Sequence, residues 1–110
     1  MIKEQQKEFN LKCAEFMGIA DEIEFFQDDS GDYFLHEKYL YDPYSDANLR
    51  NKVIEKMILQ GYEFTYYQDD GQVFLNVIDS SNNLIIDVHE GSIQANENTC
   101  IDAVLGVNNE

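Results

Sequence analysis

Two histidines and two cysteines are the side chains of this chain best suited to metal binding or nucleophilic catalysis. Neither His36 nor His89 has a cysteine or another histidine three or four positions away, the spacing of a helical zinc-ligand pair. Cys13 and Cys100 fall among apolar residues at helical spacing, where a thiol stays protonated and unreactive. The sequence also lacks a Gly-x-Ser-x-Gly motif and a phosphate-binding loop. We therefore expect half-exposed strand histidines, cysteines that pack as small hydrophobic residues, and no catalytic, cofactor or metal site. A disulfide between Cys13 and Cys100 is the alternative for the cysteines.

Two aspartate-rich segments stand out next, Asp-Asp-Ser-Gly-Asp at positions 28–32 and Asp-Asp-Gly at positions 69–71. An EF-hand calcium loop needs alternating oxygen donors and a distant bidentate glutamate, and neither segment provides them. Hairpin turns use Asp and Gly for backbone reasons alone. The sequence therefore predicts two hairpin turns, and it leaves calcium binding open as the alternative.

The charge of the chain is unusually large and unevenly placed. The formal net charge is −15, and all seven basic residues lie at or before Lys56. Positions 57–110 hold nine acidic residues and no lysine or arginine, and positions 19–49 hold nine acidic residues and one lysine. Such a field repels nucleic acids and anionic membranes and attracts basic surfaces. Direct nucleic-acid binding is excluded because phosphate contacts need a basic patch.

The carboxylates of the expected first hairpin have a spacing of their own. Glu22 and Glu24 stand two positions apart, which on one strand face is about 6.6 Å, comparable to the phosphate spacing along one DNA strand. One hypothesis is that the carboxylates stand where a nucleic-acid-handling protein expects phosphates, and the alternative is a merely solubilising acidic surface. The tyrosines around Pro43 are either interface anchors or a cover for the sheet edge. The candidate partner-binding residues are Glu22, Glu24, Asp28, Asp29, Asp32, Asp42, Tyr44, Asp69 and Asp70.

The first half of the chain must position these groups through two helices and a hairpin. Apolar residues at helical spacing predict a helix over residues 3–17, ended by Gly18. Residues 22–27 and 33–36 are typical of strands, and a tyrosine-rich connection follows over residues 38–44. Ser45 and Asp46 are N-cap candidates for a second helix that ends at Gly61. The expected core face of that helix is Leu49, Val53, Ile54, Met57 and Ile58.

The second half of the sequence predicts three strands and a closing helix. Residues 62–67, 73–79 and 84–89 are expected strands, and Asp-Gly between the first two is a strong hairpin signal. The middle strand is apolar on both faces, which favours helices on both sides of it. A short helix is expected over residues 97–105. The prediction is a single domain, residues 1–110, of α+β class, with a mostly antiparallel sheet, helices packed on its faces, and the order α-β-β-α-β-β-β-α.

Three stretches of the chain resemble the phage ABA-sandwich family of small phage and prophage proteins. They are residues 9–18 (FNLKCAEFMG), residues 41–47 (YDPYSDA) running on to 53–57 (VIEKM) and 61–62 (GY), and residues 99–105 (TCIDAVL). The chain departs from the family pattern in having no tryptophan and in carrying Asp102 where a basic residue is expected. The resemblance implies phage or prophage origin and an accessory role, and it implies no reaction.

These observations together favour a non-enzymatic binding protein. No apolar run approaches the ~20 residues of a membrane helix, and the polar start lacks a signal-peptide pattern, so we expect a location in the host bacterial cytoplasm. The expected partner is a basic or nucleic-acid-handling host protein, with the chain acting as an anti-restriction or anti-CRISPR inhibitor and existing as a monomer or small homo-oligomer. The alternative is a structural phage protein that works by self-association. A third, minor reading is an enzyme that uses carboxylates as general acid and base.

Overall fold

The computed structural model of the chain describes residues 2–29 and 31–108, and the side chains of residues 4–27, 29 and 31–107. Three α-helices and a 3-10 turn lie in this part of the chain, namely α1 (Ile2–Met17), η1 (Ala20–Glu22), α2 (Ala47–Leu59) and α3 (Ile93–Asn108). Strands β1 (Ile23–Asp28), β2 (Gly31–His36) and β3 (Tyr39–Leu40) form one antiparallel sheet, here called the N-terminal sheet. Strands β4 (Glu63–Asp69), β5 (Gln72–Ile78) and β6 (Leu84–Val88) form a second, the C-terminal sheet.

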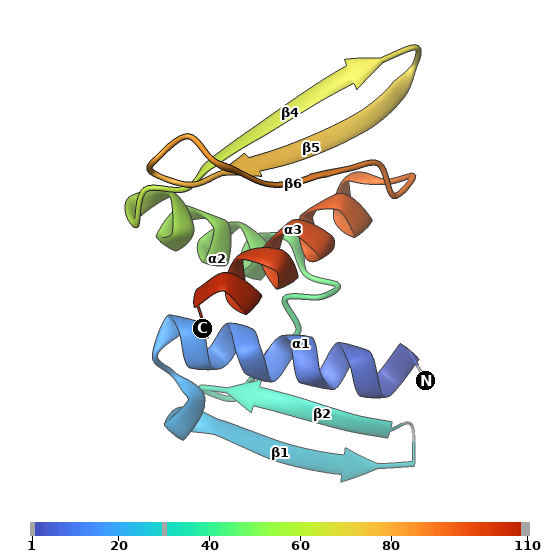
Figure 1. The fold of residues 1–110 in the computed structure, drawn as a ribbon. Coiled ribbons are helices and arrows are strands. Elements are labelled where there is room, and N and C mark those ends of the chain that lie inside the picture. Colours follow the sequence, from blue (N-terminus) through green and yellow to red (C-terminus); the bar gives the residue numbers. More distant parts are fainter. Residues whose placement is uncertain (1, 30, 109–110) are drawn as a thin grey trace.

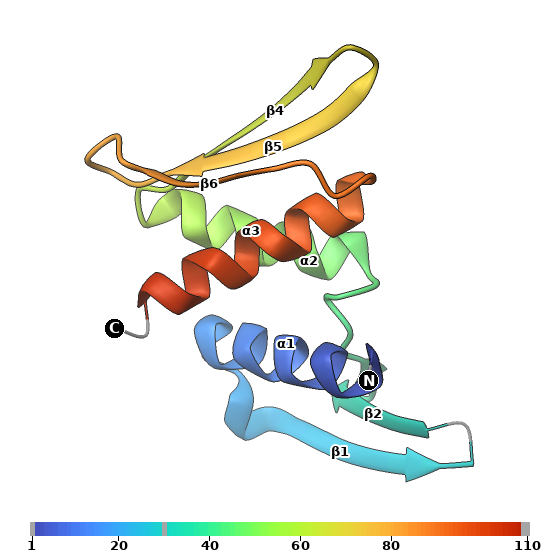
Figure 2. The same cartoon turned by 45° about the vertical axis from the view of Figure 1, so that its right-hand side comes forward.

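The helices lie between the two sheets. Figure 1 shows the C-terminal sheet above α2 and α3, with α1 below them and the N-terminal sheet beneath α1. The turned view in Figure 2 keeps the same order of layers. The predicted α+β class and the antiparallel pairing are confirmed. The expectation of one sheet is wrong, because the strands form two sheets on opposite sides of the helices.

The two faces of the central strand β5 are covered in different ways. Leu75 and Val77 are fully buried on the side of α2 and α3. On the opposite face the ring of Phe74 stacks on Tyr67 at 5.0 Å and on His89 at 4.8 Å, measured between ring centroids. These rings pack on the outer face, and Figure 1 shows helices on the other face alone, so the prediction of helices on both sides is wrong.

Local chemistry explains most of the element boundaries. Asp46 caps α2 as predicted, since its carboxylate accepts the backbone N–H groups of Asn48 and Leu49. Gly18 ends α1 with φ at 77°, a conformation that costs glycine little. The expected order missed β3, whose two-residue turn uses Glu37 and Lys38 at φ 52° and 73° in place of glycine. Helix α3 is longer than the expected 97–105 and begins at Ile93.

Most of the buried apolar surface belongs to the C-terminal sheet and the helices. Its core joins α1, α2, α3, β5 and β6 and holds fully buried residues such as Met57, Leu75 and Ile101. A second, smaller core joins Ala14, Phe34 and Tyr41 under the N-terminal sheet. Of the expected face of α2, Ile58 is 49% exposed and lies outside the core. Helix α1 thus serves both cores, one on each of its sides.

Candidate partner-binding surface

The β4–β5 turn presents the acidic pair of the second half to solvent. Asp69 pairs with Gln72, so the loop is Asp70-Gly71, with φ at 55° and 77° as a type I′ turn requires. The Asp-Gly hairpin prediction is therefore confirmed. The side chains of both Asp69 and Asp70 are exposed, and neither forms an ion pair with any residue that the structure describes.

The N-terminal sheet carries the other exposed carboxylates. Glu24 lies on β1 and Asp29 in the β1–β2 turn, both exposed and both without an ion pair in the described residues. Glu22 ends η1, so it is not on a strand, and the predicted strand-face spacing of Glu22 and Glu24 is wrong. The chain turns tightly before β1 begins at Ile23. The side chain of Asp28 lies outside the described part of the chain.

The two acidic turns do not form one continuous face. In Figures 1 and 2 the β1–β2 and β4–β5 turns lie on the same side of the molecule but at its opposite ends. The longest dimension of the chain is 43 Å. A partner that touches both turns must therefore offer a broad basic surface or two separate basic segments.

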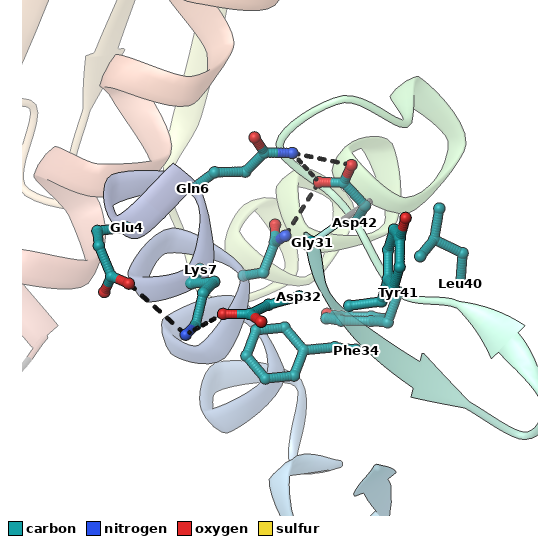
Figure 3. Close-up of a pocket in the computed structure, with 11 residues that line it drawn as sticks. Glu4, Gln6, Lys7, Gly31, Asp32, Phe34, Leu40, Tyr41 and Asp42 are labelled. Carbon is teal, nitrogen blue, oxygen red and sulfur yellow. Dashed lines mark hydrogen bonds and ion pairs between the residues drawn. The ribbon is translucent and has the colours of Figure 1, made fainter. Parts of the chain in front are cut away.

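Asp32 and Asp42 are used inside the molecule. The ammonium group of Lys7 lies 3.0 Å from Asp32, and this hydrogen bond raises the pKa of Lys7. Asp42 accepts hydrogen bonds from the Gln6 amide at 3.0 Å and from the Asn10 amide at 2.9 Å (Figure 3). Both carboxylates tie the N-terminal sheet and its connection to α1, so they are less available to a partner than predicted.

The same contacts line a cavity of about 510 Å³ between α1 and the N-terminal sheet. Figure 3 shows Phe34, Leu40 and Tyr41 along its apolar part, and burial raises the pKa of the Tyr41 hydroxyl. Each charged residue of the lining already has a partner, because Lys7 bonds Asp32 and also lies 3.7 Å from Glu4. The arrangement leaves no uncommitted charged group in the lining for a ligand or for proton transfer.

Tyr44 is held in place rather than presented. Its ring packs edge-on against Phe9, with 5.6 Å between centroids. Its carbonyl oxygen accepts hydrogen bonds from Arg50, Gln94 and Asn98, and its backbone N–H donates to the side chain of Asn10. Since Tyr44 is only partly exposed and its backbone forms these four hydrogen bonds, it anchors the connection before α2.

A buried ion pair joins the helices of the middle layer. The Nε of Arg50 lies 2.8 Å from Glu97 Oε1, and the two side chains are 4% and 6% exposed. The hydroxyl of Tyr66 donates to the other oxygen of Glu97 at 2.5 Å, and burial together with this bond raises the Tyr66 pKa. The lone arginine of the chain is thereby withdrawn from the surface.

Both cysteines are free and fully buried, as predicted. Burial raises the pKa of each thiol to about 12. A thiol with such a pKa is protonated at neutral pH, so neither cysteine has the character of a nucleophile.

The structure brings together one set of metal-binding side chains that the sequence did not reveal. Ligand atoms of Glu22, His36 and Glu37 lie within 4.8 Å of one another, the one such group found in the described residues. His36 is half-buried as expected, whereas His89 is exposed, follows β6 and bonds the Val73 carbonyl. No sequence motif signals the group, because the β1–β2 register, which pairs Ile23 with His36, brings the end of η1 next to the end of β2.

No family model matches the chain, and neither a curated protein nor a solved structure matches it. The resemblance to the phage ABA-sandwich family therefore stays a prediction. In the described residues, no helix has the length and apolar character needed to cross a membrane.

Proposed function

We propose that the chain is a non-enzymatic binding protein that engages a basic surface through its two acidic turns. The partner fits the class of basic, nucleic-acid-handling host proteins, such as a nuclease or a restriction or CRISPR effector that the chain inhibits. In this proposal the carboxylates act as a bipartite acidic surface. They do not depend on the phosphate-like spacing first expected of Glu22 and Glu24.

The observation that carries the proposal is how the basic side chains are used. Arg50 is buried against Glu97, and Lys56 donates to the Phe16 carbonyl at 2.5 Å. Lys7 and Lys12 pair with carboxylates of the helical layers and of β2. Among the residues whose side chains the structure describes, no cation pairs with Asp29, Asp69 or Asp70 at the hairpin ends, which supports attraction of a basic partner.

The test is capture from a bacterial host lysate on the immobilised chain at low and at high salt. Screening shortens the reach of exposed charges to about 8–10 Å at physiological ionic strength and less above it, so the captured partner should be released at high salt. We expect a basic nucleic-acid-handling protein among those retained at low salt. The variant for this test neutralises the unpaired carboxylates at the two turns together with Glu24 near the start of β1, as E24Q, D29N, D69N and D70N.

A matched control separates these positions from total charge. It removes four exposed carboxylates outside the turns, as E8Q, E15Q, E55Q and E90Q together. Both variants have the same net charge. A loss of capture that depends on the position of the carboxylates appears in the first variant only, whereas a loss that depends on total charge appears in both. Equal loss of capture in the two variants, or no basic protein captured at low salt, contradicts the proposal.

Self-association is the second candidate function, and one observation favours it. Strand β1 is an edge strand of the N-terminal sheet, and it exposes 56% of Phe25 and 48% of Phe26. Unprotected edges with apolar side chains are sites of strand pairing between copies. Sedimentation over a range of concentrations tests this reading. A dimer that is lost in a double F25S/F26S variant supports self-association, and a concentration-independent monomer rules it out.

A further inference from the structure

Three potential metal ligands meet where the N-terminal sheet begins. Ile23 and His36 are direct partners in the antiparallel register of β1 and β2. Continuing that register places Glu22, the last residue of η1, opposite Glu37, the first residue of the β2–β3 turn. Two separate segments thus bring their donors to one point, and backbone pairing fixes where each segment lies.

The distances already approach those of a metal site. His36 Nε2 and Glu22 Oε1 form a hydrogen bond of 3.2 Å, and the ligand atoms of all three residues lie within 4.8 Å of one another. Ligands bound tetrahedrally to zinc at about 2.0–2.1 Å are roughly 3.3 Å apart. The histidine and the first carboxylate therefore stand at ligand spacing. The exposed Glu37 side chain supplies the third ligand atom of the group.

Electrostatics favours a cation at this point. Glu22 and Glu37 are like charges on facing segments, an arrangement that is unfavourable without a counterion. Lys38 follows in the same turn, yet no ion pair joins it to either carboxylate in the described structure. A divalent cation between the carboxylates relieves their repulsion, and the net charge of −15 adds a general attraction.

The donor set selects the type of cation. Calcium and magnesium take oxygen ligands, whereas imidazole suits zinc and its transition-metal neighbours. The His36 ring is also restrained, because it packs edge-on against Tyr41 with 6.3 Å between centroids, and the side chain is only 24% exposed. We propose that Glu22, His36 and Glu37 bind one Zn²⁺ ion, with a water molecule at the position that three protein ligands leave open.

The proposal is tested by calorimetric titration of the chelator-treated full chain with Zn²⁺ at near-neutral pH. We expect one Zn²⁺ per chain, bound in the presence of excess Mg²⁺. Replacing one ligand, as E22Q, H36Q or E37Q, should weaken binding at least about tenfold, since even supporting residues around a metal contribute about 10- to 100-fold. Co²⁺ binding to the same chain, followed by visible absorption, reports coordination directly and should be lost in H36Q.

Matched controls keep the test decisive. H89Q removes the other histidine and E24Q removes a nearby exposed carboxylate, and both should bind Zn²⁺ as the unmodified chain does. E37Q changes an exposed turn side chain, so its fold, checked by circular dichroism, should stay intact even if H36Q loosens the sheet. Zinc binding that is absent in the unmodified chain, that survives both H36Q and E37Q, or that is lost equally in H89Q overturns the proposal.

Discussion

The two sheets are attached to the helices in different ways. The C-terminal sheet rests on the larger apolar core, in which Leu75 and Val77 are fully buried against α3 and its neighbours. The N-terminal sheet has a small core around Phe34 and Tyr41, and side chains of α1 also bond to Asp32 on β2 and to Asp42 in the connection after β3. The comparison indicates that apolar burial stabilises the C-terminal sheet and the helices, here called the scaffold. Polar bonds help to position the N-terminal sheet, which carries the proposed zinc ligands. The two halves should therefore respond differently to substitution.

The largest effect is expected at the buried ion pair of the scaffold. Glu97→Ala leaves Arg50 buried without its carboxylate and removes the acceptor of Tyr66, so it should lower the free energy of unfolding by about 3–5 kcal/mol. Urea denaturation measures the loss. The double substitution R50M/E97M removes both charges and should recover much of the stability. A loss below about 1 kcal/mol in Glu97→Ala would show that the pair is hydrated or dispensable.

The next effect is expected in the larger apolar core. Leu75→Ala should cost about 2–5 kcal/mol, because the residue is fully buried and the site cannot collapse freely. Phe25→Ala on the N-terminal sheet, where the side chain is 56% exposed, should cost clearly less than Leu75→Ala. Denaturant melts of the two variants make the comparison. Equal losses would contradict the assignment of the scaffold to the C-terminal half.

A smaller and more local effect is expected where the N-terminal sheet meets α1. Asp42→Ala removes the acceptor of the Asn10 amide, and Asn10 is 5% exposed, so the cost should be about 1–3 kcal/mol. In this variant the amide hydrogen-exchange rate should rise more in β2 than in β5, relative to the unmodified chain. Asp29→Ala, at an exposed turn position, is the control and should change neither rate. Uniform quickening across both sheets would show that they unfold as one unit.

The smallest effect on stability at neutral pH is expected from ionisation of the two thiols. Their reactivity also tests whether α1 unfolds with the N-terminal sheet or with the rest of the helices. Burial raises the pKa of Cys13 and Cys100 from 9.0 to about 12, so their contribution to stability is complete below pH 9. It declines as the pH rises toward 12, because the unfolded chain ionises first. The unfolding free energy of the chain should therefore fall over this range more than that of a C13A/C100A variant.

At neutral pH both thiols should resist a thiol reagent equally. Faster labelling of Cys13 would mean that α1 separates with the N-terminal sheet.

What the sequence predicts well is local chemistry. The Asp70-Gly71 turn and the Asp46 cap depend only on residues close in the sequence. Asp and Gly adopt the positive φ angles of the turn, and the Asp46 carboxylate accepts the N–H groups of the next helical turn. Both are present as expected. The α+β class follows from the order of such elements. The layer order does not, because an apolar strand such as β5 can be covered by helices or by its own stacked rings, and periodicity cannot distinguish these.

The candidate site was predicted only in part, for the same physical reason. Asp70 lies in the β4–β5 turn and Asp69 directly before it, and both are exposed, as the Asp-Gly turn signal in the sequence indicates. Asp32 and Asp42 are engaged because α1 lies against them, which depends on tertiary packing. The grouping of Glu22, His36 and Glu37 depends on strand register and on a turn without glycine, and neither leaves a mark in residue spacing.

We propose that the unpaired carboxylates of the two turns, together with Glu24 on β1, attract a basic partner, and one measurement tests this most directly. The affinity of the captured partner should be compared for E24Q/D29N, for D69N/D70N and for the helix control E15Q/E55Q at several salt concentrations. Each turn variant should weaken binding roughly twofold to thirtyfold at low salt, since an exposed charge pair contributes modestly, and the control should not. A control that weakens binding as much as the turn variants, or turn variants that bind unchanged, would contradict the account.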